Sequence, residues 1–181
     1  MKSGMGRNDD PNPESEGIIE AAKALAIRAH AGQKRKWTGG YAYFEHPRRV
    51  AECVADLDGS DEMIAAAYLH DVLEDTQVTE QEILDATNLE VLRLVVELTN
   101  RRAKAIRIVR KRLDNDRLAG ISLAAKFIKL MDRIDNLREM EGAPDDFKKL
   151  YAEESLELAE AIGDVSEHWK SVLLTLATEL L

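Results

Sequence analysis

The sequence has only one cysteine, Cys53, so no disulfide can form within the chain. No stretch approaches the roughly 20 apolar residues that a membrane-spanning helix requires, and the polar first residues do not resemble a signal sequence. Aromatic residues make up 5% of the chain, whereas alanine, leucine, glutamate, lysine and arginine are abundant, a balance that favours helices over sheets. Together these absences predict a cytoplasmic, helical protein without a membrane partner.

The chain also has fewer basic than acidic residues. The chain has 25 lysine and arginine residues but 34 aspartate and glutamate residues, so its formal net charge is -9. A chain this acidic is poorly suited to wrapping duplex nucleic acid through bulk electrostatic attraction. A local basic patch can still bind a small anionic ligand, so the composition argues against a nucleic-acid partner but not against a charged small molecule.

The length and composition predict one globular domain. With 45% hydrophobic and 33% charged residues, the 181-residue chain can bury a substantial core. The opening MKSGMGRNDDPNPE is polar and rich in Gly, Pro, Asn and Asp, which predicts a disordered leader over residues 1–14. No internal repeat or long linker divides the remainder, so residues 15–181 are expected to form a single domain.

Helical periodicity runs through almost the whole domain, and no segment shows convincing period-2 alternation. The fold class is therefore predicted to be all-α, a single-domain helical bundle. Pro47 is expected to start the second helix, Asp61 to cap the third, and Thr79 to open the fourth with a capping box. Apolar stripes are predicted on a basic helix (Ile106, Val109, Leu113) and on the long helix near 121–140 (Leu123, Phe127, Leu130, Ile134, Leu137).

The segment AAAYLHDVLEDT, residues 65–76, begins as an apolar core helix and then turns abruptly to a histidine and three carboxylates. On a helix, residues four apart lie one above the other, so His70 lies over Glu74 and Asp71 over Asp75, and all four residues are predicted to share one continuous side of a single helix. Unpaired carboxylates are too costly to bury, so they must meet partners, share protons or bind a metal. The alternative is that the helix emerges into solvent and these residues form an ordinary polar end.

Two further polar residues stand out. Asp132, with Asn136 one turn later, interrupts the apolar pattern of the long helix; it could equally be a buried carboxylate paired with Arg133 or Lys129. His46 precedes a proline, which should hold it in an extended conformation, and it could also be a capping or an exposed histidine.

Taken together, these residues make a mixed nitrogen and oxygen ligand set: His46, His70, Asp71 and Asp132. The absence of cysteine from the set disfavours structural zinc. Mn²⁺, Fe²⁺, Mg²⁺ or Zn²⁺ in an open catalytic site all remain compatible with these donors.

The same residues carry a resemblance to a known family. They match the H…HD…D signature of the HD-domain metal-dependent phosphohydrolases. More narrowly, AHAGQKRKWTG…HP, YLHDVLEDT and KLMDRIDNL resemble the hydrolase domain of the Rel/Spo alarmone enzymes, above all the stand-alone small alarmone hydrolases of the metazoan SpoT-homologue type. The resemblance covers residues 18 to about 160 and implies a bundle of the HD-domain type.

The resemblance also implies a division of roles. One divalent metal, usually Mn²⁺, would be held by the H…HD…D residues His46, His70, Asp71 and Asp132. Glu74 and Asp75 would position and deprotonate the attacking water. The implied reaction removes the 3′-pyrophosphate of guanosine tetra- or pentaphosphate, so that ppGpp yields GDP and pyrophosphate. Nothing resembles the alarmone synthetase half, so a hydrolase without synthetase activity is expected.

A nucleotide with several phosphates needs cations nearby. Arg35 and Lys36 in the QKRK loop are expected to contact phosphate or guanine, although a charge run is usually a solvated surface loop. The resemblance places Arg107 where a relative has a substrate-facing lysine. Asn136 could hold a sugar hydroxyl or orient a metal ligand. Tyr151 matches a family tyrosine near the nucleoside, but it could equally be a core residue.

Two other functions remain open from the sequence. One is an HD phosphohydrolase of another nucleotide, such as a phosphatase acting on NADPH. The other is a regulatory module that binds alarmone without turnover, which the complete set of ligands and carboxylates argues against. The sequence departs from the family near Ala42, where relatives usually have a proline, and at Asn100, where an acidic residue is common. Assembly into a homo-oligomer also remains open.

Overall fold

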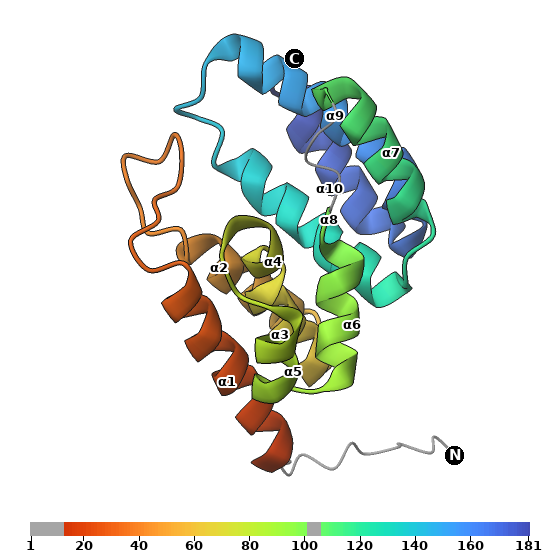
Figure 1. The fold of residues 1–181 in the computed structure, drawn as a ribbon. Helices are drawn as coiled ribbons and strands as arrows, with labels where there is room; N and C mark the ends of the chain where they lie inside the picture. Colours follow the sequence, from red (N-terminus) through yellow and green to blue (C-terminus); the bar gives the residue numbers. More distant parts are fainter. Residues whose placement is uncertain (1–12, 101–105) are drawn as a thin grey trace, which may run out of the picture.

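Figure 1 shows the computed structural model, which describes residues 13–100 and 106–181. Within these ranges the regular secondary structure is helical apart from one isolated antiparallel bridge between Lys34 and Ala42, so the predicted all-α class is confirmed. The helices are α1 (Pro13–Ala29), α2 (Glu45–Asp56), α3 (Asp61–Leu69), α4 (Val72–Asp75), α5 (Glu80–Ala86), α6 (Leu89–Leu98), α7 (Arg107–Ala119), α8 (Leu123–Arg138), α9 (Asp145–Ile162), the 3-10 turn η1 (Gly163–Val165) and α10 (Glu167–Thr178).

Two sequence-based expectations concern the chain ends and membranes. Residues 1–12 of the expected leader lie outside the described residues, and residues 13 and 14 already belong to α1. Across the part of the chain that the structure describes, no helix has both the length and the apolar content needed to cross a bilayer.

Side-chain caps define where several helices begin. The Thr79 hydroxyl accepts a hydrogen bond from the backbone N–H of Glu82, and the Glu82 carboxylate accepts one from the N–H of Thr79, so the predicted capping box opens α5. Helix α3 is capped by Ser60 and not by Asp61, because the Ser60 hydroxyl accepts from the N–H of Met63. Asp61 instead occupies the first helical position, where its charge interacts favourably with the helix dipole.

The start of α2 differs from the prediction. Pro47 was expected to begin the helix after an extended His46, whereas α2 begins at Glu45 and includes both residues. Pro47 fits because the first N–H groups of a helix have no intrahelical acceptor. The residue before a proline normally avoids the helical region. For His46 that preference is overridden by buried hydrogen bonds between its two ring nitrogens and carboxylates of α8.

Helix α8 crosses the middle of the molecule and joins its two halves (Figure 1). One half packs α2, α3 and α6 against α8, with α1 lying on α3; the other packs α9 and α10 against it, with α7 lying on α9. Because Leu173 and Ala177 are buried, the C-terminal helix α10 packs on its own bundle. Large side chains that fill the interior include Leu25, Leu69, Leu94, Ile128 and Leu130.

The prediction of an inward-facing apolar stripe on the basic helix was wrong. Ile106, Val109 and Leu113 all lie on the surface, and 72% of the residue surface of Ile106 is exposed. Helix α7 packs against α9 with charged side chains at the contact, notably the ion pair between Arg107 and Glu154. The three residues of the predicted stripe consequently face outward, whereas Leu118, in the last turn of α7, is buried.

The stripe predicted on the long helix is mostly buried. Leu130, Ile134 and Leu137 are almost inaccessible to solvent, and Phe127 packs at the edge of the core. Leu123 is the exception, with 62% of its surface exposed, because the first turn of α8 turns its other side toward the core. The buried part of α8 is the part that carries the polar residues of the candidate site.

Candidate active site

The polar residues of the HDVLED segment do not lie along one continuous helix as predicted. Helix α3 ends at Leu69 and the single-turn α4 begins at Val72, so His70 and Asp71 occupy the break between them. The ring nitrogen Nδ1 of His70 lies 2.7 Å from the carbonyl oxygen of Ala67, which ties the ring to the last turn of α3. At the break, Oδ2 of Asp71 lies 3.3 Å from Nε2 of His70, although neighbours on a regular helix do not face each other.

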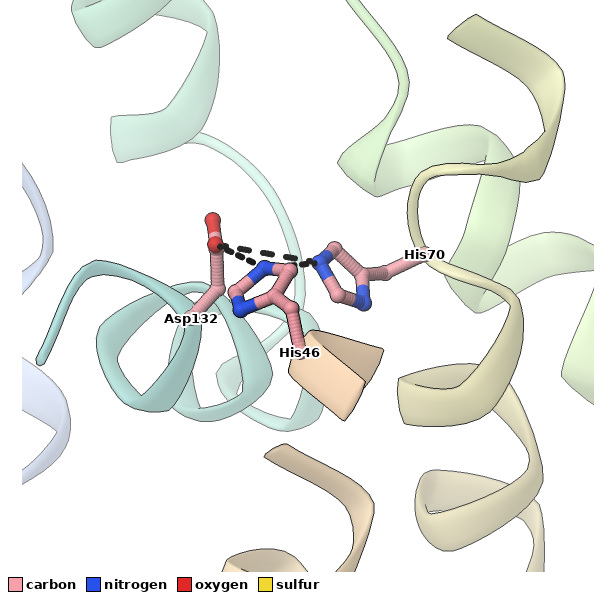
Figure 2. A group of neighbouring side chains, drawn as sticks. All are labelled: His46, His70 and Asp132. Carbon is pink, nitrogen blue, oxygen red and sulfur yellow. Dashed lines mark hydrogen bonds and ion pairs between the residues drawn. The ribbon is translucent and has the colours of Figure 1, made fainter. Parts of the chain in front are cut away.

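Residues from three helical segments converge at one buried point (Figure 2). His46 comes from the first turn of α2, His70 from the end of α3 and Asp132 from α8, and their candidate ligand atoms all lie within 4.8 Å of one another. His46 Nε2 lies 3.1 Å from Oδ1 of Asp132 and 3.2 Å from Nε2 of His70. Oδ2 of Asp71 adds a fourth atom, 3.7 Å from His46 Nε2.

The outer nitrogen of each imidazole already has an acceptor, which determines what the inner nitrogen can do. His46 Nδ1 lies 2.7 Å from Oδ2 of Asp135, and His70 Nδ1 faces a backbone carbonyl. With a proton on each Nδ1, the two Nε2 lone pairs point toward each other and toward two carboxylates. Four electron-pair donors at one buried point must either take up protons or bind a cation. Two imidazoles and two carboxylates fit a divalent metal ion and leave positions for water.

The protonation of these groups reflects the same concentration of negative charge. Burial alone would lower the pKa of His70, but the charge of Asp71 and a hydrogen bond to Asp132 outweigh it and raise that pKa well above its usual value. Burial would raise the pKa of Asp132, yet the ammonium of Lys129 and the two histidines hold it well below its usual range. Metal binding must therefore displace protons from the imidazoles.

Two neighbouring residues of α8 donate hydrogen bonds to the Asp132 carboxylate. Lys129 Nζ donates to Oδ2 over 2.7 Å, and the side-chain amide of Asn136 donates to Oδ1. Of the two ion-pair partners that the sequence left open, Lys129 pairs with Asp132, whereas the guanidinium of Arg133 lies over the ring of Tyr151 at 4.4 Å. Asn136 thus contacts the aspartate, which is compatible with one of its two predicted roles; a contact with a substrate sugar stays a prediction.

Glu74 and Asp75, the residues implied to activate water, lie in α4 beside this centre. The hydroxyl of Tyr43 lies 2.8 Å from Oδ2 of Asp71 and 2.8 Å from Oδ2 of Asp75, so it joins a candidate metal ligand to a candidate catalytic carboxylate. Burial and these two carboxylates raise the pKa of Tyr43, which keeps its hydroxyl protonated. The Glu74 carboxylate accepts from the N–H of Asn100, and partial loss of solvation in the cleft raises its pKa.

A cleft of about 520 Å³ opens beside the centre. It combines aromatic rings with cations of the QKRK loop, and the indole of Trp37 packs against the ring of Phe147 with centroids 5.9 Å apart. Flat rings and guanidinium groups of this kind bind a base by stacking and phosphates by charge. Its lining includes Lys34, Arg35, Lys36, Trp37, Tyr43, Asp75, Asn136, Phe147 and Tyr151.

A second cleft, of about 480 Å³, shares Asp75 with the first. Burial and the charges of Arg133 and Lys129 lower the pKa of Lys111 in this cleft to about 8. At neutral pH the lysine therefore remains mostly charged and supplies a cation to which an anion can bind. Its lining includes the carboxylates of Glu74, Asp75 and Asp114, the cations of Arg110, Lys111 and Lys129, and the polar residues Thr99 and Asn100.

Four of the predicted substrate contacts line the first cleft: Arg35, Lys36, Asn136 and Tyr151. The guanidinium of Arg35 is held at the cleft wall by two acceptors, Oδ1 of Asn136 at 2.7 Å and Oε2 of Glu139 at 2.8 Å. Its orientation is consequently set before any ligand binds.

Arg107 lies elsewhere. Its guanidinium donates twice to the carboxylate of Glu154, over 2.6 and 2.9 Å, and lies over the ring of Phe147 at 5.3 Å. It is not among the residues that line the two clefts described above. Arg107 thus contacts Phe147, an aromatic residue that lines the first cleft.

Three residues of the site were not found from the sequence: Tyr43, Asp135, which lies against His46, and Arg49, which donates to Asp135. A signal existed for two of them, because Arg49 follows His46 by three positions and Asp135 follows Asp132 by three, which places each pair on one helical face. Tyr43 lies in an irregular loop, where no periodicity indicates which way a side chain points.

The all-helical fold and the histidine–aspartate centre define the class of protein. Residues 22–159 match the family model described as HD domain, and the chain belongs to the HD-domain family. The resemblance expected from the H…HD…D motif is thereby confirmed.

Two proteins of similar sequence and one solved structure of similar fold were also found. The human guanosine-3′,5′-bis(diphosphate) 3′-pyrophosphohydrolase MESH1 is 36% identical over 129 residues, which cover 70% of this chain and 71% of the human one. The GTP pyrophosphokinase rsh of Brucella ovis is 32% identical over 150 residues, 80% of this chain but only 20% of the relative, so the chain spans about a fifth of that enzyme's length. A solved structure of a metazoan SpoT orthologue that hydrolyses ppGpp has the same fold, with a TM-score of 0.81, 24% identity, and coverage of 95% of this chain and 99% of that one.

Proposed function

We propose that the protein is a metal-dependent 3′-pyrophosphohydrolase of guanosine tetra- and pentaphosphate, converting ppGpp to GDP and pyrophosphate. One observation carries the proposal: four candidate ligand atoms converge beside two carboxylates, one of which, Asp75, lines both the first and the second cleft. The substrate class is supported by the human relative, which is similar over most of both chains and bears this activity in its name.

Mn²⁺ is the metal that we propose for the centre, with His46, His70, Asp71 and Asp132 as its ligands. Imidazole and carboxylate donors are compatible with this ion. When bound, it would supply positive charge to a phosphate oxygen and to the attacking water.

Glu74 is the proposed general base and Asp75 its partner in positioning water. In the reaction, the water oxygen forms a bond to the phosphorus attached to the ribose, and the bond between that phosphorus and the ribose 3′ oxygen breaks. The Glu74 carboxylate accepts a proton from the water and passes it on to the 3′ oxygen, which leaves as a hydroxyl. The hydroxyl of Tyr43 and the N–H of Asn100 hold the two carboxylates in place for this transfer.

The two clefts suggest how the nucleotide lies. We place guanosine in the first cleft, against the rings of Trp37 and Tyr151 and the guanidinium of Arg35. Phosphates would then meet Lys36 at the cleft mouth and Lys111 in the second cleft. Asp75, common to both clefts, would lie close to the bond that breaks.

The direct test incubates purified protein and Mn²⁺ with ppGpp, NADPH or simple mononucleotides in separate reactions and identifies the products by chromatography. Release of GDP and pyrophosphate supports the proposal. Orthophosphate released from NADPH alone would overturn the substrate, and tight binding of ppGpp without any product would overturn the activity.

Arg35→Gln is expected to raise KM for ppGpp by about 10–100-fold with a smaller effect on kcat, because a hydrogen bond to a charged group contributes about 1.5–3 kcal/mol. Steady-state kinetics measure both constants. The matched control is Arg48→Gln, since Arg48 pairs with Glu45 and Glu52 on the surface. Equal KM values for the two variants would contradict the placement of guanosine in the first cleft.

Tyr43→Phe is expected to lower kcat by about 10–100-fold, because the hydroxyl that joins Asp71 to Asp75 is lost while the ring stacked on His30 remains. Turnover at saturating Mn²⁺ and ppGpp is the measurement. Tyr41→Phe is the control, as Tyr41 is exposed. If both variants turn over at the same rate, Tyr43 does not position the carboxylates.

A further inference from the structure

The hydrogen bond at Nδ1 of His46 begins a partly buried network that the proposed mechanism does not use. Nδ1 of His46 lies 2.7 Å from Oδ2 of Asp135, whose residue surface is only 8% exposed. Asp135 accepts two further hydrogen bonds from Arg49, from Nε to Oδ1 over 2.7 Å and from Nη2 to Oδ2 over 2.9 Å. This bidentate pairing fixes both carboxylate oxygens.

Helical spacing explains why these residues meet. His46 and Arg49 lie three positions apart on α2, and Asp132 and Asp135 lie three positions apart on α8, so each pair shares a helical face. The two faces pack together, and His46 contacts Asp132 through Nε2 and Asp135 through Nδ1. Arg49 is anchored a second time, with Nη2 2.5 Å from Oε1 of Glu139.

We propose that Asp135 and Arg49 are positioning residues of the metal centre. Asp135 holds the proton of His46 on Nδ1 and so directs the Nε2 lone pair to the metal, while Arg49 holds Asp135 in place. This inference rests on the metal site of the proposed function. A carboxylate that accepts from the ring N–H of a metal-binding histidine sets the orientation of the ring, and its loss typically weakens metal affinity by about 10–100-fold.

A purely structural role makes a different prediction. If the Asp135–Arg49 pair only joined α2 to α8, its removal would lower the melting temperature of the metal-free protein and leave the affinity of the folded protein for metal unchanged. The informative quantity is therefore the dissociation constant for Mn²⁺ of folded, metal-free protein.

The experiment titrates metal-free wild type, Asp135→Asn, Arg49→Gln and Arg48→Gln with Mn²⁺ and follows the electron paramagnetic resonance signal of the free ion. Melting curves of each metal-free variant report folding. Asp135→Asn keeps the size of the side chain and is expected to raise the Kd for Mn²⁺ by about 10–100-fold. Arg49→Gln should raise it by a smaller factor, and Arg48→Gln, which removes a surface arginine adjacent to Arg49, should leave it at the wild-type value.

The outcomes separate this inference from the proposed function. A wild-type protein that binds no Mn²⁺ overturns the proposed metal site and this inference with it. A wild type that binds Mn²⁺, together with an Asp135→Asn variant of equal Kd, overturns the positioning role alone. If Asp135→Asn does not fold, the Kd of Arg49→Gln for Mn²⁺ tests the positioning role instead. An Arg49→Gln Kd equal to that of Arg48→Gln would overturn that role.

Discussion

Glu74→Gln is expected to lower kcat for ppGpp hydrolysis by about 10²–10⁴-fold, the range that a positioned general base contributes. Glutamine has the size of glutamate and can still accept the hydrogen bond from the N–H of Asn100, so the geometry of α4 should persist. It cannot accept a proton from water. Single-turnover kinetics at saturating Mn²⁺ measure the chemical step directly.

Two controls make the Glu74 result specific. The affinity of Glu74→Gln for Mn²⁺ should match the wild type, because Glu74 is not among the four candidate ligands. Glu157→Gln, a change of the same chemistry at an exposed position of α9, should turn over normally. Normal turnover by Glu74→Gln would instead transfer the role of base to another group, with Asp75 the first to examine.

Asp71→Ala should abolish metal-dependent turnover, with a loss of about 10³-fold or more, since the charge supplied by a bound metal contributes several kcal/mol. Removing Asp71 takes one carboxylate from the centre and leaves two imidazoles and Asp132. Calorimetric titration of the metal-free variant with Mn²⁺ should show greatly weakened binding, and a chelator should inactivate the wild type reversibly.

The control for Asp71→Ala is Asp85→Ala, which removes an exposed carboxylate paired with Gln81. This variant should keep both metal binding and activity. Melting curves of the metal-free proteins show whether Asp71→Ala still folds, and Asp71→Asn offers a second variant of nearly identical shape. Wild-type activity in Asp71→Asn would remove Asp71 from the ligand set.

The helices could be predicted because their signals are local. The Thr79 capping box, the apolar residues of α8 and the short loops all depend on neighbours within a few positions, and the structure contains the corresponding elements. Errors arose where packing overrides local preference. His46 is helical before a proline because α8 provides partners for both ring nitrogens, and the stripe from Ile106 faces solvent because α7 contacts α9 through charged residues.

The break after Leu69 shows the limit of periodicity. The spacing predicts a continuous helix through His70 and Glu74, with the four polar residues along one side. In the structure the chain leaves the helix at His70 and re-enters it at Val72, which brings Asp71 against the His70 ring. Hydrogen bonding of His70 to Ala67 and of Asp71 to Tyr43 stabilises that break.

By itself, the amino-acid sequence determined the helical class of this protein and the chemical identity of its candidate ligands, because residue types and their spacing are written along the chain. The tertiary structure alone decided which nitrogen of each histidine faces the centre and that Tyr43 joins Asp71 to Asp75. It also decided that Asp135 contacts His46 and that Arg49 donates to Asp135. These contacts join residues as far as 89 positions apart, and only the packing of α2 against α8 brings such distant groups within hydrogen-bonding reach.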